Sequence, residues 1–177
     1  MIIKRRKANE RKIKQMCVFA MFGGLMFVSK MIMEFLPNFH LLGMFIVSLT
    51  VVYRKKALIP IYVYVMLDGL FHGFNLWWYP YLYVWTVLWG LTMLLPKKIP
   101  PKVAPFVYSL TAAFHGIIFG SLYAPFQALV YGFGFDKLVE WIMLGITFDV
   151  IHAIGNFIVG ILIYPSIKLF LKLEKMY

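Results

Sequence analysis

Two long stretches without a charged side chain constrain the fold of this chain more than any other feature. No Asp, Glu, Lys or Arg occurs from Gly69 to Pro96 or from Val103 to Phe135. A helix needs about 20 apolar residues to cross the hydrocarbon core of a bilayer, and both stretches exceed that length. The mean hydropathy is +0.80 and 62% of the residues are hydrophobic. The chain is therefore predicted to be an all-α integral membrane protein with a single domain, residues 1–177.

Basic residues divide the chain at regular intervals. All Lys and Arg residues except Lys30 and Lys137 fall into groups at 4–14, 54–56, 97–102 and 168–175. Cytoplasmic loops carry such residues, so the spacing predicts a compact bundle of six transmembrane helices with both termini cytoplasmic. After a basic cytoplasmic segment, 1–14, the spans are expected at about 14–35, 41–53, 57–72, 81–95, 103–123 and 141–170. The short spans leave re-entrant segments as an alternative.

Several functional classes lack support in the sequence. The net charge of +11 is explained by membrane topology and anionic lipids, without nucleic acid. The single cysteine, Cys17, cannot form an internal disulfide or a cysteine metal cluster. No phosphate-binding loop, zinc-binding HExxH or GxSxG nucleophile motif occurs. We therefore expect no catalytic residue, no bound metal and no cofactor on this chain.

An aromatic run with a break in its middle is the first candidate for a binding site. Trp, Tyr and Phe crowd residues 71–89, where Gly73, Asn75 and Pro80 interrupt the helical pattern. The predicted topology places the loop 73–80 on the outer side. Rigid rings at such a break are suited to hold a planar molecule, although Trp and Tyr also anchor helices at membrane interfaces.

Ionisable and polar residues inside the predicted spans are further candidates, since burying a charge in a membrane costs about 2.5–3.5 kcal/mol. They are Tyr64, Asp68 and His72 in the third span, His115 in the fifth, and Asp149, His152 and Asn156 in the sixth. Helical spacing puts each set on one face. Internal hydrogen bonds are the alternative for Asp149 with His152 and for Asp68 with His72. Lys30 and Glu34, one turn apart, are expected to pair with each other.

The charge balance of these spans favours a neutral or cationic ring as the ligand. A dianion would need Arg or Lys clamps, and spans three to six contain none in their outer halves. The complete set of predicted substrate-binding residues is Asn38, His40, Asp68, His72, Asn75, Trp77, Trp78, Tyr81, Trp85, His115, Asp149, His152 and Asn156.

Small residues at four-residue spacing form two flat faces that another helix could approach closely. The face on span five, Ala112 to Ala124, is expected to pack inside the protein. The face on span one comprises Cys17, Ala20, Gly23 and Gly24. It is a candidate interface with a partner subunit, with internal packing as the alternative.

Three short segments carry a resemblance to a known family. They are Ala20-Met-Phe-Gly-Gly24, Leu36-Pro37-Asn38-Phe39-His40 and Asp149-Val-Ile-His152-Ala153-Ile-Gly-Asn156. With the six short spans and the basic ends, they resemble the substrate-binding S components of energy-coupling factor (ECF) vitamin transporters. In that family the second small residue of the first segment is Ala, where this chain has Gly24.

The resemblance implies the S component of an ECF-type ABC importer in the prokaryotic cytoplasmic membrane. Such a subunit captures a vitamin or precursor from outside, here of thiamine, pyridoxine, queuosine or corrinoid type. It docks through span one onto a transmembrane coupling subunit, and two cytoplasmic ATPase subunits bind ATP and Mg. The alternatives are a stand-alone carrier or channel, or a membrane enzyme that uses Asp149 and His152.

Overall fold

The computed structural model describes residues 2–36 and 38–176, and every regular element in these ranges is helical. In chain order the elements are α1 (Ile2–Ile32), α2 (Leu42–Tyr53), the 3-10 helix η1 (Arg54–Ala57), α3 (Leu58–His72), α4 (Tyr81–Leu94), α5 (Ala104–Ile117), α6 (Phe119–Tyr131), α7 (Phe135–Gly160) and α8 (Ile163–Glu174). The all-α prediction is confirmed for the described residues. Pro37, in the predicted outer loop, lies outside them.

Three helical stretches among the described residues are long and apolar enough to cross a bilayer, which agrees with a membrane protein but supports only three of the six predicted spans. They are Asn9–Ile32, Ala104–Tyr131 and Phe135–Gly160. Large apolar side chains on the last two are exposed, including Leu129 and Leu144. Lipid can cover such side chains, whereas water would disfavour so many of them.

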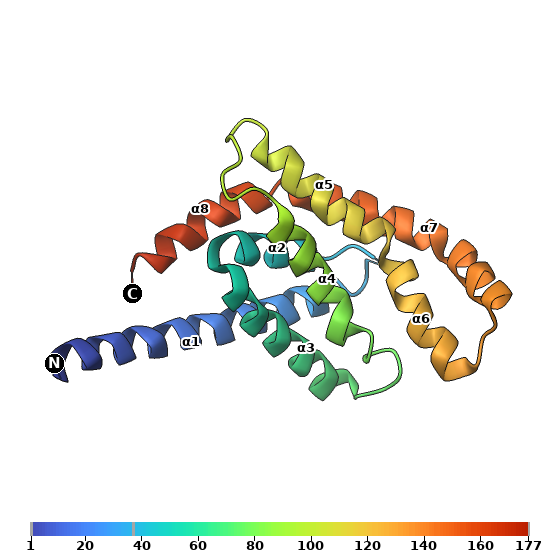
Figure 1. Cartoon of the computed structure of the whole chain (residues 1–177), viewed down its shortest axis with the longest axis horizontal. Coiled ribbons are helices and arrows are strands. Elements are labelled where there is room, and N and C mark those ends of the chain that lie inside the picture. The colour runs from blue at the N-terminus through green and yellow to red at the C-terminus, as the bar shows by residue number, and fades with distance from the viewer. Residues whose placement is uncertain (1, 37, 177) are drawn as a thin grey trace.

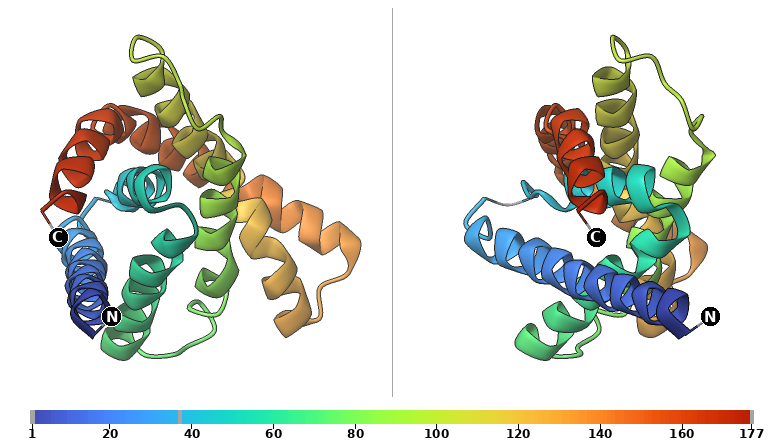
Figure 2. Two further views of the ribbon diagram at one scale, coloured as in Figure 1. Left: turned by 60° about the vertical axis from the view of Figure 1, so that its left-hand side comes forward. Right: turned by 90° about the vertical axis from the view of Figure 1, so that its left-hand side faces the viewer.

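Helix α2 lies at the centre of the molecule. It contacts α1, α4, α5, α7 and α8, and Figure 2 shows these helices arranged around it. Its twelve residues contain no charged side chain, which allows it to be buried on most sides. Thr50 satisfies its hydroxyl within the helix by donating to the carbonyl of Ile46 at 2.6 Å.

Helices α5 and α7 pack side by side through small residues (Figure 1). A Cβ atom added to Gly116 would lie 2.8 Å from the Cα of Ala153, and one added to Gly160 would lie 2.6 Å from the Cα of Ser109. Neither space accommodates a methyl group. The small-residue face from Ala112 to Ala124, which continues from α5 into α6, therefore packs inside the protein, as expected.

The helix boundaries agree with the predicted spans in the middle of the chain and differ near the end. Helices α2, α3 and α4 match the predicted spans to within one residue. The predicted span 103–123 is divided at Ile118, and α6 then turns away from α5 (Figure 1). Much of the predicted outer segment 124–140 is helical, because it contains the end of α6 and the start of α7.

The predicted span 141–170 is also two helices, α7 and α8, separated by residues 161 and 162. Pro165 explains this division, since proline lacks the N–H that a continuous helix would need at that position. In the structure Pro165 lies in the first turn of α8, where no intrahelical donor is required.

Candidate functional site

Aromatic and histidine rings from five parts of the chain surround Trp85, which is 1% exposed. Measured between ring centroids, Trp85 lies 5.4 Å from Tyr81, 5.7 Å from Phe119, 5.8 Å from His115, 5.9 Å from His40 and 6.2 Å from Tyr64. His152 joins the group through His40 and Phe119, each 4.9 Å away. We call these seven residues the Trp85 cluster.

Helix periodicity explains why several members of the Trp85 cluster lie on the same helix face. Tyr81 and Trp85 are one turn apart on α4, so their rings lie on the same face. His115 and Phe119 are likewise four residues apart, although the break at Ile118 separates them. The loop before α2 brings His40 against His152 of α7. Five helices, α3 to α7, and the loop before α2 therefore contribute to the Trp85 cluster.

Unpartnered polar atoms are concentrated in this cluster. Five buried side-chain atoms in it have no hydrogen-bond partner within the described chain, and they are His40 Nδ1, Tyr64 Oη, Trp85 Nε1, His115 Nδ1 and His152 Nε2. Leaving a buried polar group unsatisfied costs about 1–3 kcal/mol. Folded proteins rarely leave several such groups together, which makes the cluster the candidate site for a polar molecule.

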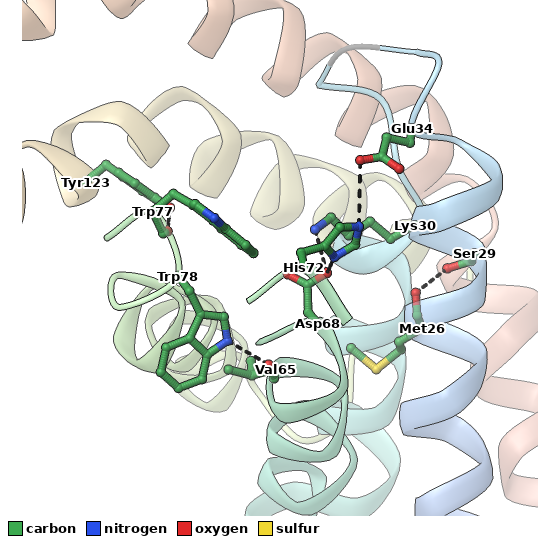
Figure 3. Close-up of polar contacts among 10 residues, drawn as sticks. All are labelled: Met26, Ser29, Lys30, Glu34, Val65, Asp68, His72, Trp77, Trp78 and Tyr123. Carbon is green, nitrogen blue, oxygen red and sulfur yellow. Dashed lines mark hydrogen bonds and ion pairs between the residues drawn. The ribbon is translucent and has the colours of Figure 1, made fainter. Parts of the chain in front are cut away.

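A second group of residues, which we call the Lys30 cluster, adjoins the first through the ring of Tyr81. Figure 3 shows Lys30, Asp68 and His72 of this group close together. Lys30 Nζ is 2.6 Å from Asp68 Oδ1, and His72 Nδ1 is 3.3 Å from the same oxygen. The ammonium group also lies 5.5 Å from the ring centroids of both Trp77 and Tyr81. The protein's own cation thus occupies the aromatic surface that the sequence analysis assigned to a ligand.

The expected pairing of Lys30 with Glu34 is therefore wrong. The side chain of Asp68 is completely buried, whereas that of Glu34 is 62% exposed. A buried carboxylate needs a charged partner far more than an exposed one does. Glu34 instead lies 3.9 Å from His72 Nε2.

We expect Lys30→Met to lower the free energy of unfolding by about 3–5 kcal/mol, because it leaves the Asp68 carboxylate buried without its cation. Urea titration of the detergent-purified protein, followed by Trp fluorescence, measures this loss. Glu34→Gln is the matched control and should change stability by less than about 0.5 kcal/mol. Adding Asp68→Leu to Lys30→Met should restore most of the stability. Equal effects of Lys30→Met and Glu34→Gln would contradict the assignment.

Two of the three polar residues on α7 make structural hydrogen bonds. Asp149 Oδ1 accepts the N–H of Gly120 at 2.9 Å and so satisfies a free donor in the first turn of α6. Asn156 Nδ2 donates to the carbonyl of Ala112 at 3.2 Å. No hydrogen bond joins Asp149 to His152 in the described structure. Of these three residues, only His152 belongs to the Trp85 cluster.

An open groove of about 480 Å³ adjoins the cluster on the side of α6 and α7. Its lining includes Asn38, Phe119, Tyr123, Trp141, Phe148 and Asp149. Phe119 lines the groove and also contacts Trp85, His115 and His152. This ring therefore forms a boundary between the groove and the buried cluster.

The aromatic loop contributes less to the cluster than its composition predicts. The Trp78 indole donates to the carbonyl of Val65 at 2.8 Å, which anchors the loop on α3 (Figure 3). Asn75 is exposed and its amide lies 3.5 Å from the carbonyl of His72. The carbonyl of Trp77 accepts a hydrogen bond from the Tyr123 hydroxyl, which holds the loop against α6.

Sequence reasoning missed Phe119 and Tyr123, although a signal for both was present. They follow His115 at four-residue intervals, the spacing that aligns side chains along one helix face. Phe119 and Tyr123 stack with their ring centroids 5.5 Å apart. The break at Ile118 does not interrupt this row of rings.

Only part of the candidate partner face on α1 is accessible in the structure. Cys17 and Ala20 are exposed, and a Cβ atom added to Gly24 would meet nothing within 4 Å. Gly23, in contrast, packs on α3, where an added Cβ atom would meet the side chain of Val63. The accessible small-residue face therefore consists of Cys17, Ala20 and Gly24.

Within the described residues, no three His, Cys, Asp or Glu side chains are placed to hold a metal ion. Comparison with protein-family models, curated proteins and solved structures found no match to the chain.

Proposed function

We propose that this protein is the membrane-embedded substrate-binding subunit of an ECF-type importer for a small, water-soluble ring compound. The observation that carries the proposal is the concentration of unpartnered buried polar atoms around Trp85. Stacked and edge-on ring contacts contribute about 0.5–1.5 kcal/mol each. Several such contacts together with a few hydrogen bonds are enough for micromolar or tighter binding.

The proposed topology follows the distribution of basic residues. Both termini and the groups at 54–56 and 97–102 would face the cytoplasm of a prokaryotic cell. The six crossings would use α1, the short helices α2 to α4, the α5–α6 pair and the α7–α8 pair. The short helices require local thinning of the bilayer. The Trp85 cluster and its groove would then open toward the outer side.

The small-residue face of Cys17, Ala20 and Gly24 is the proposed docking surface for a transmembrane coupling subunit. Small side chains permit close approach of a second helix, and this face of α1 is not used for packing against α3. Two ATPase subunits on separate chains would supply the energy, consistent with a sequence that contains no phosphate-binding loop.

Binding to a panel of vitamins and their precursors tests the proposal. The purified chain is titrated with each compound while Trp fluorescence is recorded, and any molecule that copurifies is identified by mass spectrometry. We expect at least one compound to change the fluorescence at micromolar concentration, because Trp85 and Trp77 lie at the site. Absence of binding by every compound, together with no copurifying molecule, would contradict the proposal.

A further inference from the structure

The charges near the proposed site are already balanced within the protein. Asp68 is neutralised by Lys30, whose ammonium group also covers the faces of Trp77 and Tyr81. A cationic ligand would have to displace Lys30 from these rings. Burial lowers the pKa of His40 to about 4, so its imidazole is uncharged at neutral pH. The ring cluster therefore favours a ligand without net charge.

The hydrogen bond made by His115 determines its tautomer. His115 Nε2 lies 3.0 Å from the carbonyl oxygen of Val84. A carbonyl only accepts, so Nε2 carries the proton. His115 is completely buried, and an unpaired imidazolium is costly in such a place. In the neutral ring Nδ1 is consequently an acceptor, and it has no partner in the described chain.

Trp85 places an unpartnered hydrogen-bond donor next to this acceptor. An indole Nε1–H only donates, and that of Trp85 is buried without an acceptor in the described residues. The rings of Trp85 and His115 are 5.8 Å apart with an interplanar angle of 34°. Neighbouring rings thus present one free donor and one free acceptor. Tyr64, His40 and His152 add groups that can satisfy further polar atoms of a ligand.

We infer that the site takes an uncharged planar heterocycle whose edge carries an N–H donor beside a carbonyl or ring-nitrogen acceptor. Cyclic amides such as pyrimidinones, purinones and pteridinones have this edge. The ring N–H donates to His115 Nδ1, and the carbonyl accepts from Trp85 Nε1–H. This assignment rests on the proposed function and narrows its ligand from neutral or cationic rings to neutral lactams.

Pairs of ring compounds that differ by one N-methyl group test the assignment. The probes are 9-methylhypoxanthine with 1,9-dimethylhypoxanthine, 1-methylthymine with 1,3-dimethylthymine, and 1-methyllumazine with 1,3-dimethyllumazine. In each pair the additional methyl group replaces the only remaining ring N–H and retains the carbonyl beside it. Equilibrium dialysis against the full-length purified chain should show at least one lactam binding about ten times more tightly than its N-methyl partner, the factor expected for one unsatisfied buried acceptor. N-methylpyridinium serves as the cationic probe and should not compete.

Two variants separate the roles of the two rings. His115→Phe retains a ring and removes both nitrogens, so the ligand N–H loses its acceptor and the lactam preference should fall below about three-fold. Trp85→Phe retains the ring and removes the donor. It should weaken the binding of both compounds of a pair by about five- to ten-fold. The ratio of their affinities should stay unchanged. Trp89→Phe, one turn away on α4, is the matched control and should alter neither value.

The outcomes distinguish this inference from the function on which it rests. Equal binding of each lactam and its N-methyl partner would overturn it, as expected if water satisfies these groups. A preference that survives in His115→Phe, or binding of only the pyridinium probe, would also overturn it. If a vitamin binds but is charged or lacks the donor–acceptor edge, the inference fails alone. If no compound from either panel binds, the proposed function fails with it.

Discussion

Replacing Ala20 by Trp is expected to abolish uptake while leaving ligand affinity unchanged. Ala20 is exposed on α1, and the adjoining position Gly24 has open space around it. An indole at this position would hold a coupling helix away from the small-residue face, and close approach is what such faces provide. Uptake of radiolabelled ligand in cells that express the coupling module, with dialysis on the purified variant, measures both effects.

Ile32→Trp provides the control for this experiment. Ile32 is 65% exposed and lies three turns further along α1, away from the small-residue face, so the same bulk there should leave uptake intact. Normal uptake by Ala20→Trp would contradict the assignment of this face as the docking surface. Uptake in cells without any coupling subunit would favour a stand-alone carrier.

Replacing Trp85 by Leu is expected to weaken ligand binding by about 30- to 1,000-fold. The substitution removes the donor and the ring around which the cluster is arranged. The loss of two or three aromatic contacts with the ligand amounts to about 2–4 kcal/mol, and each 1.4 kcal/mol corresponds to about a factor of ten. Equilibrium dialysis with the tightest ligand of the panel measures the change.

Trp89→Leu is the matched control, since Trp89 is on the same helix and its indole donates to the carbonyl of Arg54 at 3.1 Å, outside the Trp85 cluster. Its ligand affinity should remain within about three-fold of wild type, a change of less than 1 kcal/mol. If both variants bind ligand as the wild type does, the binding site lies elsewhere. If both lose binding and elute as aggregates, Trp85→Phe, which retains the ring, decides between loss of the site and loss of the fold.

The sequence determined the helical class and the apolar nature of the helices, because both depend on local composition. Uncharged stretches, basic groups and the interruptions at Gly73 and Pro80 located α2, α3 and α4 to within one residue. The divisions at Ile118 and between α7 and α8 were harder to predict. An apolar sequence without charges is compatible with a continuous helix. Hydropathy contains no information about the bend at Ile118 or about the backbone N–H that Pro165 lacks.

Only the tertiary structure decided which polar residues meet. The sequence placed Lys30 one turn from Glu34, yet Lys30 pairs with Asp68, because a buried carboxylate gains most from a cation. It aligned Asp149 with His152, yet Asp149 binds the backbone of α6. The rings around Trp85 come from segments far apart in the chain, so only the packing of α2 to α7 brings them together. Helix periodicity predicts which residues share a face. The packing of the helices determines what that face contacts.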